Sequence, residues 1–290
     1  MNAKMNIMEN PYKLDLPAVV SFSGGRTSGY MLWHILDAFG GKKPDGLEIC
    51  FQNTGLEHPK TLEFINECSQ QWNVPITWLE YVLDDDNQFT FQVVDYETCS
   101  KNGEPFTRMI KKKNYLPNPV ARICTANLKM SILQKYLKTL EGFEDGWDNA
   151  VGLRADEPHR VHRLKADSNY DKPVTPLYPS GVTQPMVNEW WQNQPFNLNL
   201  PLGGNIAGNC VGCFLKGKAN LESLVKEMPE HFEWWAEAEK IPLKSQPEGG
   251  RFRNDRPSYE EMIKTSKSQG WLFTPEEMAI DDSRPCFCTD

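Results

Sequence analysis

The chain contains 290 residues, of which 39% are hydrophobic and 24% charged, and its formal net charge is -8. An acidic chain is not expected to hold nucleic acid over its whole surface, because such binding relies on many basic side chains at phosphates. This charge still allows a local basic groove for a nucleic-acid acceptor. No apolar run is long enough to span a bilayer, and residues 1–13 lack the apolar stretch of a secretory signal. We therefore expect a cytoplasmic protein without a membrane partner.

Short apolar segments alternate with helical patterns in the first half of the chain. Four segments are typical of buried strands: residues 17–22, 46–51, 76–81 and 149–153. Apolar residues recur at helical spacing from Met31 to Phe39 and again from Leu62 to Cys68. This alternation predicts an α/β fold, a Rossmann-like parallel sheet covered by helices. Because crossovers between parallel strands are right-handed, the carboxyl ends of the strands should share one edge, where a ligand binds.

The pattern changes after about residue 165. Six prolines between Pro173 and Pro201 interrupt a stretch with one clear helix, around residues 187–194. We predict an α/β nucleotide-binding domain at residues 1–165. A mostly helical and loop region at residues 166–290, which carries paired cysteines, is expected to pack on it.

An apolar strand runs directly into the loop Ser21-Phe22-Ser23-Gly24-Gly25-Arg26-Thr27-Ser28, and a helical pattern follows. Two glycines let the backbone turn tightly and approach a ligand, and the first amides of the helix direct a positive dipole end toward the same place. Hydroxyl groups in the loop add further donors. The pattern favours a phosphate site, and the alternative is an ordinary strand-to-helix turn with a hydroxyl cap.

Eight cysteines are expected to stay reduced, because nothing in the sequence indicates export. Cys50 and Cys68 lie in apolar patterns and are expected in the core. Two close pairs lie in loop-like sequence: Cys210 with Cys213, and Cys286 with Cys288. Together with Cys124 these thiols suffice for tetrahedral zinc or an iron-sulfur cluster, whereas the pair Cys210-x-x-Cys213 alone also suits a redox dithiol.

Several segments resemble the motifs of one known family. Ser23-Gly24-Gly25-Arg26-Thr27-Ser28 resembles the phosphate-binding PP-loop. The other segments are Asn53-Thr54-Gly55 with Glu57, Arg122 to Lys129 with Cys124 inside it, and Val151-Gly152-Leu153-Arg154 with Asp156 and Glu157. On these motifs the chain resembles the phosphoadenosine phosphosulfate (PAPS) reductase-like family of the adenine nucleotide alpha hydrolase (PP-loop) superfamily, and within it the phage and prophage members.

The resemblance implies an enzyme that binds ATP or an adenylyl sulfate and acts on sulfur. The implied nucleotide-binding residues are Ser23, Gly24, Gly25, Arg26, Thr27, Ser28, Asn53, Thr54, Gly55, Glu57 and Gly152. Arg122, Lys129 and Arg154 would neutralise the transferring group, and magnesium would accompany ATP. The chemistry is either reduction of an adenylyl sulfate or ATP-dependent adenylation followed by sulfur transfer. An electron or sulfur donor protein is an implied partner.

The resemblance also favours a 4Fe-4S cluster over zinc. Its implied ligands are Cys124, Cys210, Cys213 and one of Cys286 and Cys288. The chain departs from the family pattern at Arg26-Thr27, where many ATP-splitting relatives have Lys-Asp, and in its tail, which lacks the Glu-Cys-Gly-Leu-His of assimilatory reductases. These departures motivate an alternative function, a non-catalytic nucleotide-binding protein with a structural zinc.

Three features have structural interpretations beside the functional ones. Arg154 forms either a phosphate contact or an ion pair with Asp156 or Glu157, and His58 is a candidate cap for a helix near Pro59. Two adjacent tryptophan pairs, 190–191 and 234–235, form either a platform for a base or, in the favoured interpretation, one core ring beside a partly exposed one.

Overall fold

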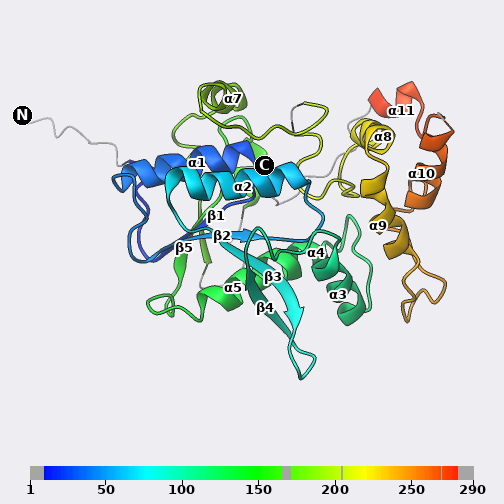
Figure 1. Ribbon diagram of the computed structural model, residues 1–290, viewed down its shortest axis with the longest axis horizontal. Helices are drawn as coiled ribbons and strands as arrows, with labels where there is room; N and C mark the ends of the chain where they lie inside the picture. The colour runs from blue at the N-terminus through cyan, green and yellow to red at the C-terminus, as the bar shows by residue number, and fades with distance from the viewer. Residues whose placement is uncertain (1–9, 165–170, 204, 269, 280–290) are drawn as a thin grey trace, which may run out of the picture.

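The computed structural model describes residues 10–164, 171–203, 205–268 and 270–279 (Figure 1). Its centre is a six-stranded sheet in the order β4-β3-β2-β1-β5-β6. The strands are β1 (Ala18–Ser21), β2 (Leu47–Gln52), β3 (Thr77–Leu83), β4 (Phe89–Val94), β5 (Trp147–Ala150) and β6 (Asp171–Val174). Neighbouring strands are parallel except β3 and β4, which are antiparallel. The predicted α/β class with a Rossmann-like, mostly parallel sheet is confirmed.

Helices cover both faces of the sheet. The helices are α1 (Arg26–Ala38), α2 (Pro59–Trp72), α3 (Glu104–Lys113), α4 (Ile123–Thr125), the π-helical turn η1 (Ala126–Ser131), α5 (Ile132–Leu137), α6 (Pro158–Arg163), α7 (Gln184–Gln192), α8 (Lys218–Glu227), α9 (Glu230–Glu239), α10 (Tyr259–Lys267) and α11 (Pro275–Ala279). Figure 1 shows α1 and α2 over one face and α3 to α5 over the other, with α8 to α11 gathered at one end. Within the described residues, no helix is long and apolar enough to cross a membrane.

All four predicted strands are present, although β5 begins two residues earlier than expected. Two strands were not predicted. β4 follows a tight turn after β3, and β6 is a short edge strand that contains Pro173. Proline is tolerated at a sheet edge, where its missing amide hydrogen breaks no ladder bond. Since β6 follows residue 165 and pairs with β5, the sheet extends past the predicted domain boundary, and that division stays a prediction.

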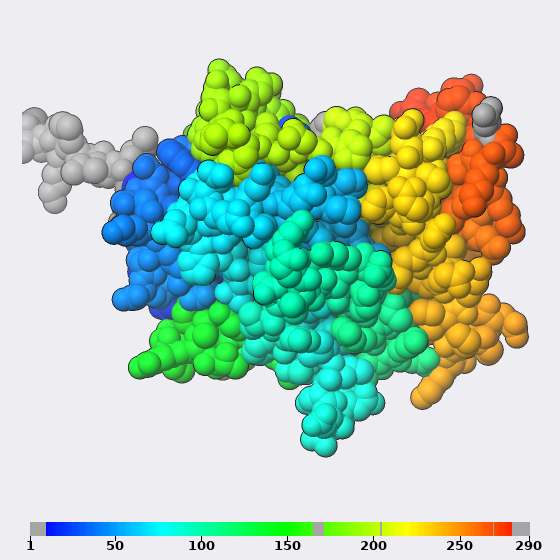
Figure 2. Space-filling model, viewed as in Figure 1, coloured from blue at the N-terminus to red at the C-terminus, as the bar shows by residue number. Residues whose placement is uncertain are grey.

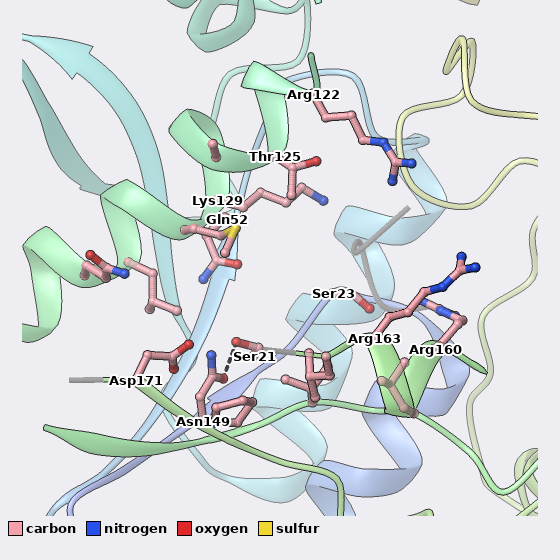
Figure 3. Close-up of a pocket in the computed structure, with 18 of the residues that line it drawn as sticks. Ser21, Ser23, Gln52, Arg122, Thr125, Lys129, Asn149, Arg160, Arg163 and Asp171 are labelled. Carbon is pink, nitrogen blue, oxygen red and sulfur yellow. Dashed lines mark hydrogen bonds between the residues drawn. The ribbon is translucent and has the colours of Figure 1, made fainter. Parts of the chain in front are cut away.

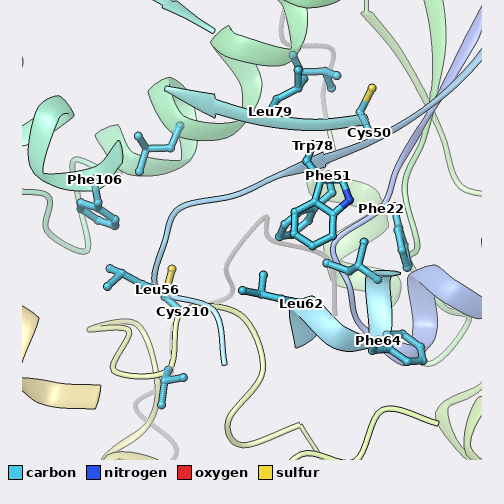
Figure 4. Close-up of a cluster of buried hydrophobic side chains, with 14 of the residues drawn as sticks. Phe22, Cys50, Phe51, Leu56, Leu62, Phe64, Trp78, Leu79, Phe106 and Cys210 are labelled. Carbon is cyan, nitrogen blue, oxygen red and sulfur yellow. The ribbon is translucent and has the colours of Figure 1, made fainter. Parts of the chain in front are cut away.

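The core lies between the sheet and the helices on its faces (Figure 4). Phe22, directly after β1, Phe51 from β2 and Phe64 from α2 are almost completely buried. Cys50 and Cys68 are fully buried, which confirms their predicted place in the core. Such close packing fixes where the strands end, and therefore where the loops after them begin.

The C-terminal helices pack against the α/β part of the molecule (Figure 2). Val211 N donates a hydrogen bond to Leu56 O at 3.0 Å, in the loop after β2. Trp234 Nε1 donates to Thr107 Oγ1 at 3.0 Å, which attaches α9 to α3. The second half of the chain is thus joined to the sheet at its carboxyl edge.

Trp191 is expected to contribute most of the stability of the contact between α7 and α1. It is fully buried, and its Nε1 donates to Arg26 O at 2.7 Å. Trp191→Ala should lower the free energy of unfolding by about 3–5 kcal/mol, because it leaves a large cavity. Urea unfolding measures this loss, and Trp190→Ala, at the partly exposed neighbour, is the matched control. Equal losses in the two variants would contradict this account.

Candidate functional site

A cavity of about 590 Å³ lies at the carboxyl edge of the sheet (Figure 3). Its volume is in the range of pockets that enclose small-molecule ligands. The side chains that line it come from loops and strands on both sides of β1. They include Ser21, Ser23, Phe51, Gln52, Arg122, Thr125, Lys129, Leu133, Trp147, Asn149, Arg160, Arg163, Asp171 and Pro173. The predicted ligand edge of the sheet therefore carries a cavity.

The loop after β1 turns sharply into α1. Gly24 has φ +77°, a left-handed conformation that favours glycine, and an added Cβ would lie 2.7 Å from Thr61 Cγ2. Gly25 is the N-cap of α1, and the cap has no side-chain hydrogen bond. Inside the loop, Ser28 Oγ donates to Gly25 O and lies 2.9 Å from Ser23 Oγ. Ser23 faces the main cavity beside this uncapped helix end, which suits an anion.

The other loop residues do not line the main cavity. Gly24 and Gly25 border a small space of about 10 Å³ with Thr61, whereas Arg26 and Thr27 border a separate cavity of about 160 Å³. Arg26 donates hydrogen bonds to Asn188 Oδ1 and Leu198 O, so it contacts α7 and the loop after it.

Four basic side chains surround the part of the cavity above Ser23. Arg122 and Lys129 come from the segment α4–η1, and Arg160 and Arg163 from α6 (Figure 3). Lys129 lies in a π-helical turn, a feature that recurs at functional sites. Arg160 and Arg163 were not among the predicted site residues. Their spacing of three residues in a helix that follows the β5 loop was the available signal, since it places both on one face.

Arg154 is bonded to the first turn of α1 and to two carboxylates. Its Nη1 donates to Thr27 Oγ1 at 3.0 Å, its Nε donates to Asp156 at 2.9 Å, and its Nη2 lies 3.4 Å from Glu157. The residue is 8% exposed and does not line the main cavity. The ion-pair interpretation is thus confirmed, and Arg154 positions the start of α1. A direct contact between Arg154 and the transferring group stays a prediction.

Gly152 also supports the start of α1. A Cβ added at Gly152 would lie 3.4 Å from Ser28 Cα, so the loop after β5 runs close to the first turn of the helix. Gly152 therefore packs against the first turn of α1. A nucleotide contact at Gly152 stays a prediction.

The loop from Asn53 to Glu57 is held by hydrogen bonds within the loop and to neighbouring segments. Asn53 Nδ2 donates to Glu80 Oε1 and Ser100 O, and its Oδ1 accepts from Gly55 N. The Glu57 carboxylate accepts from Thr54 N and Thr54 Oγ1. Burial raises the pKa of this carboxyl group, against the opposing effects of Lys129 and of the Thr54 hydrogen bonds. None of these residues lines the main cavity, whereas the preceding residue, Gln52, does.

The cysteine pair after residue 209 lies beside this loop. Cys210 pairs with Glu57 in a β-bridge, and its Sγ lies 3.2 Å from Thr54 Oγ1. Cys210 is buried, and Cys213 and Cys124 are partly buried. Thiols are suitable ligands for a cluster, but within the described ranges no three His, Cys, Asp or Glu side chains are grouped to hold a metal. The other predicted ligands, Cys286 and Cys288, lie outside those ranges.

The structural interpretations of two other features are confirmed. His58 is the N-cap of α2, and its side chain accepts a hydrogen bond from Lys60 N. In each tryptophan pair one ring is buried, Trp191 or Trp235, and its neighbour is partly buried. The adjacent tryptophans are therefore part of the packing rather than an open platform.

Fold and site together define an α/β protein with a basic cavity at the carboxyl edge of its parallel sheet. No protein-family model matches the chain. The chain is 32% identical over 216 residues to an uncharacterized nin region protein, ORF290, of Escherichia phage lambda, and the match covers 72% of this chain and 69% of that protein. The chain belongs to the same family as this phage protein.

Other similarities are weaker. An uncharacterized protein of Methanocaldococcus jannaschii is 23% identical over 241 residues, and the match spans 80% of this chain but 43% of that protein. Two solved structures each align with a TM-score of 0.39. The first is PAPS reductase from Candida auris in a phosphate complex, with 16% identity, 67% of this chain and 85% of that chain covered. The second is the U34-tRNA thiolase NcsA from Methanococcus maripaludis with its [4Fe-4S] cluster. It is 10% identical, and the alignment covers 91% of this chain and 74% of that chain. Scores this low support no functional conclusion.

Gly24→Ala is expected to destabilise the protein and to weaken anion binding. The left-handed φ costs about 1–2 kcal/mol, and the collision with Thr61 and Ile65 adds about 1–3 kcal/mol. Gly40→Ala is a matched control, because Gly40 has φ +79° and nothing within 4 Å of an added Cβ. Thermal unfolding of both variants measures the difference. The same decrease in unfolding temperature in both variants would show that the turn at Gly24 has room for a side chain.

Proposed function

We propose that this protein is an adenine-nucleotide-binding enzyme of PP-loop type that acts on sulfur. One arrangement carries the proposal: Ser23, beside the uncapped end of α1, faces four basic side chains across a cavity of about 590 Å³. The helix dipole and guanidinium groups favour phosphate and sulfate oxygens at this place. The resemblance of residues 23–28 to the PP-loop supports an adenine nucleotide as the ligand.

The basic end of the cavity suits both candidate reactions. In reduction of an adenylyl sulfate, a donor thiol attacks sulfur, the bond from sulfur to the phosphate oxygen breaks, and an adenosine phosphate leaves. A second donor thiol then displaces sulfite from the resulting S-sulfonate and forms a disulfide. In adenylation, an acceptor oxygen attacks the α-phosphorus of ATP, and pyrophosphate leaves with magnesium as its counterion. Each reaction places developing negative charge on a leaving group. Arg122, Lys129, Arg160 and Arg163 would stabilise that charge without rearranging.

The cysteines supply the second element of the proposal. Cys124, Cys210, Cys213 and one of Cys286 and Cys288 would hold a 4Fe-4S cluster, with structural zinc as the alternative. The support is their motif pattern and the place of Cys210 beside the loop after β2. A donor of electrons or sulfur, and in the transfer reaction a nucleic-acid acceptor, would be the partners in the cytoplasm. Residues 166–290 would form the cysteine-bearing region of the enzyme.

Nucleotide binding is expected to depend on Lys129 and Arg163. Lys129→Met and Arg163→Gln should each weaken ATP or adenosine 5′-phosphosulfate about 10-fold, because each removes one charge-assisted phosphate contact. Isothermal titration calorimetry measures the affinities. Arg108→Gln is the control, because Arg108 lies on α3, outside the lining of the cavity, with its Nη1 3.5 Å from Tyr81 O. Binding that is unaffected in both cavity variants, or absent in the wild type, would refute the site.

Protein purified anaerobically is expected to contain iron and sulfide and to absorb broadly in the visible range. Cys210→Ala should lose the iron. Cys99→Ala should retain it, because Cys99 is a buried thiol whose pKa burial raises to about 11 and it belongs to neither cysteine pair. Metal analysis and absorbance spectroscopy measure the iron content of the wild type and of both variants. A colourless protein with one zinc would establish the alternative metal.

A further inference from the structure

The two ends of the main cavity differ in chemistry. One end carries the basic groups around Ser23, as described above. The other end, where β1, β2, β5 and β6 run side by side, carries the amides of Gln52 and Asn149 and the carboxylate of Asp171 (Figure 3). If phosphates occupy the basic end, the rest of the nucleotide extends toward the amides.

The Gln52 amide nitrogen has no hydrogen-bond partner among the described residues, although it is buried. A buried donor without a partner costs about 1–3 kcal/mol, and a ligand acceptor would remove that cost. The adjacent residue, Asn53, contrasts with it, because both of its amide atoms are bonded inside the protein. Gln52 thus lines the cavity with an amide nitrogen that no other described residue bonds.

Asn149 presents a second amide from the neighbouring side of the cavity. Its Oδ1 accepts from Ser21 Oγ at 2.7 Å, which fixes the side chain and leaves its Nδ2 as a donor. In Figure 3 the Asn149 side chain rises into the same space as Gln52. The two side chains therefore offer donors and one acceptor, the Gln52 Oε1, to one ligand.

Apolar groups form the remaining walls of this end. Phe51, Leu133, Trp147 and Pro173 line the cavity. Walls of this kind with a few polar groups suit a flat heteroaromatic ring.

We infer that Gln52 and Asn149 recognise the base of the bound nucleotide and select adenine. The inference rests on the proposed function, which places the phosphates at the basic end. The Gln52 amide can accept from the 6-amino group of adenine and donate to N7, the bidentate pairing that amides make with adenine. Guanine presents two acceptors, O6 and N7, on that edge, so Gln52 Oε1 would face another acceptor.

The test compares Gln52→Met, which keeps the length of the side chain and removes the amide, with Gln70→Met, an exposed glutamine on α2. Calorimetric titrations use ATP, GTP and inorganic tripolyphosphate. We expect the wild type to prefer ATP over GTP and Gln52→Met to bind ATP about 10- to 100-fold more weakly. Tripolyphosphate affinity should be unchanged, because it reports on the basic end alone. Gln70→Met should match the wild type.

Asn149→Ser is measured in parallel, so that the assignment does not depend on one variant, and thermal unfolding verifies that each is folded. Equal affinity of the wild type for ATP and GTP, or undiminished ATP binding in both cavity variants, would overturn the base assignment while leaving the phosphate site intact. If neither ATP nor tripolyphosphate binds the wild type, the proposed function fails, and the base assignment fails with it.

Discussion

The first turn of α1 packs directly against the loop after β5, and the geometry of the site depends on this contact. At Gly152 the loop lies close to the helix, since an added Cβ would be 3.4 Å from Ser28 Cα. Arg154 then holds Thr27 through a buried hydrogen bond, while Asp156 and Glu157 balance its charge. A helix dipole acts over a short range, so its attraction for an anion depends on where the helix begins. Two segments far apart in sequence therefore fix the position of the first turn of α1 together.

Much of the fold could be predicted from the sequence, because its signals are local. Apolar runs mark the central strands, and the pair Gly24-Gly25 marks a tight turn, which the structure shows at φ +77° for Gly24. β6 could not be found in this way, because a four-residue edge strand with a proline has no distinct apolar pattern. Its place follows from pairing with β5, which is a contact between segments distant in sequence.

The site was less predictable than the fold. Sequence motifs identify which residues follow a strand but not which way each side chain turns. Asn53 bonds to Glu80 and Ser100, and Glu57 bonds within its own loop, whereas Gln52 lines the cavity. Asn53 and Glu57 lie beyond the last residue of β2, where strand alternation no longer predicts the direction of a side chain. Arg154 likewise turns toward α1, whereas Arg160 and Arg163, which the motifs do not include, line the cavity.

The proline in β6 has a consequence for how the protein behaves at high concentration. Val174 O accepts a hydrogen bond from Val151 N on the β5 side, so the backbone nitrogen of the preceding residue, Pro173, turns toward the outer edge. That edge lacks one of the N–H groups with which another chain would form a continuous ladder. Open strand edges promote aggregation, and proline is one of the residues that prevent it. Pro173 thus both lines the ligand cavity and discourages edge-to-edge association of the sheet.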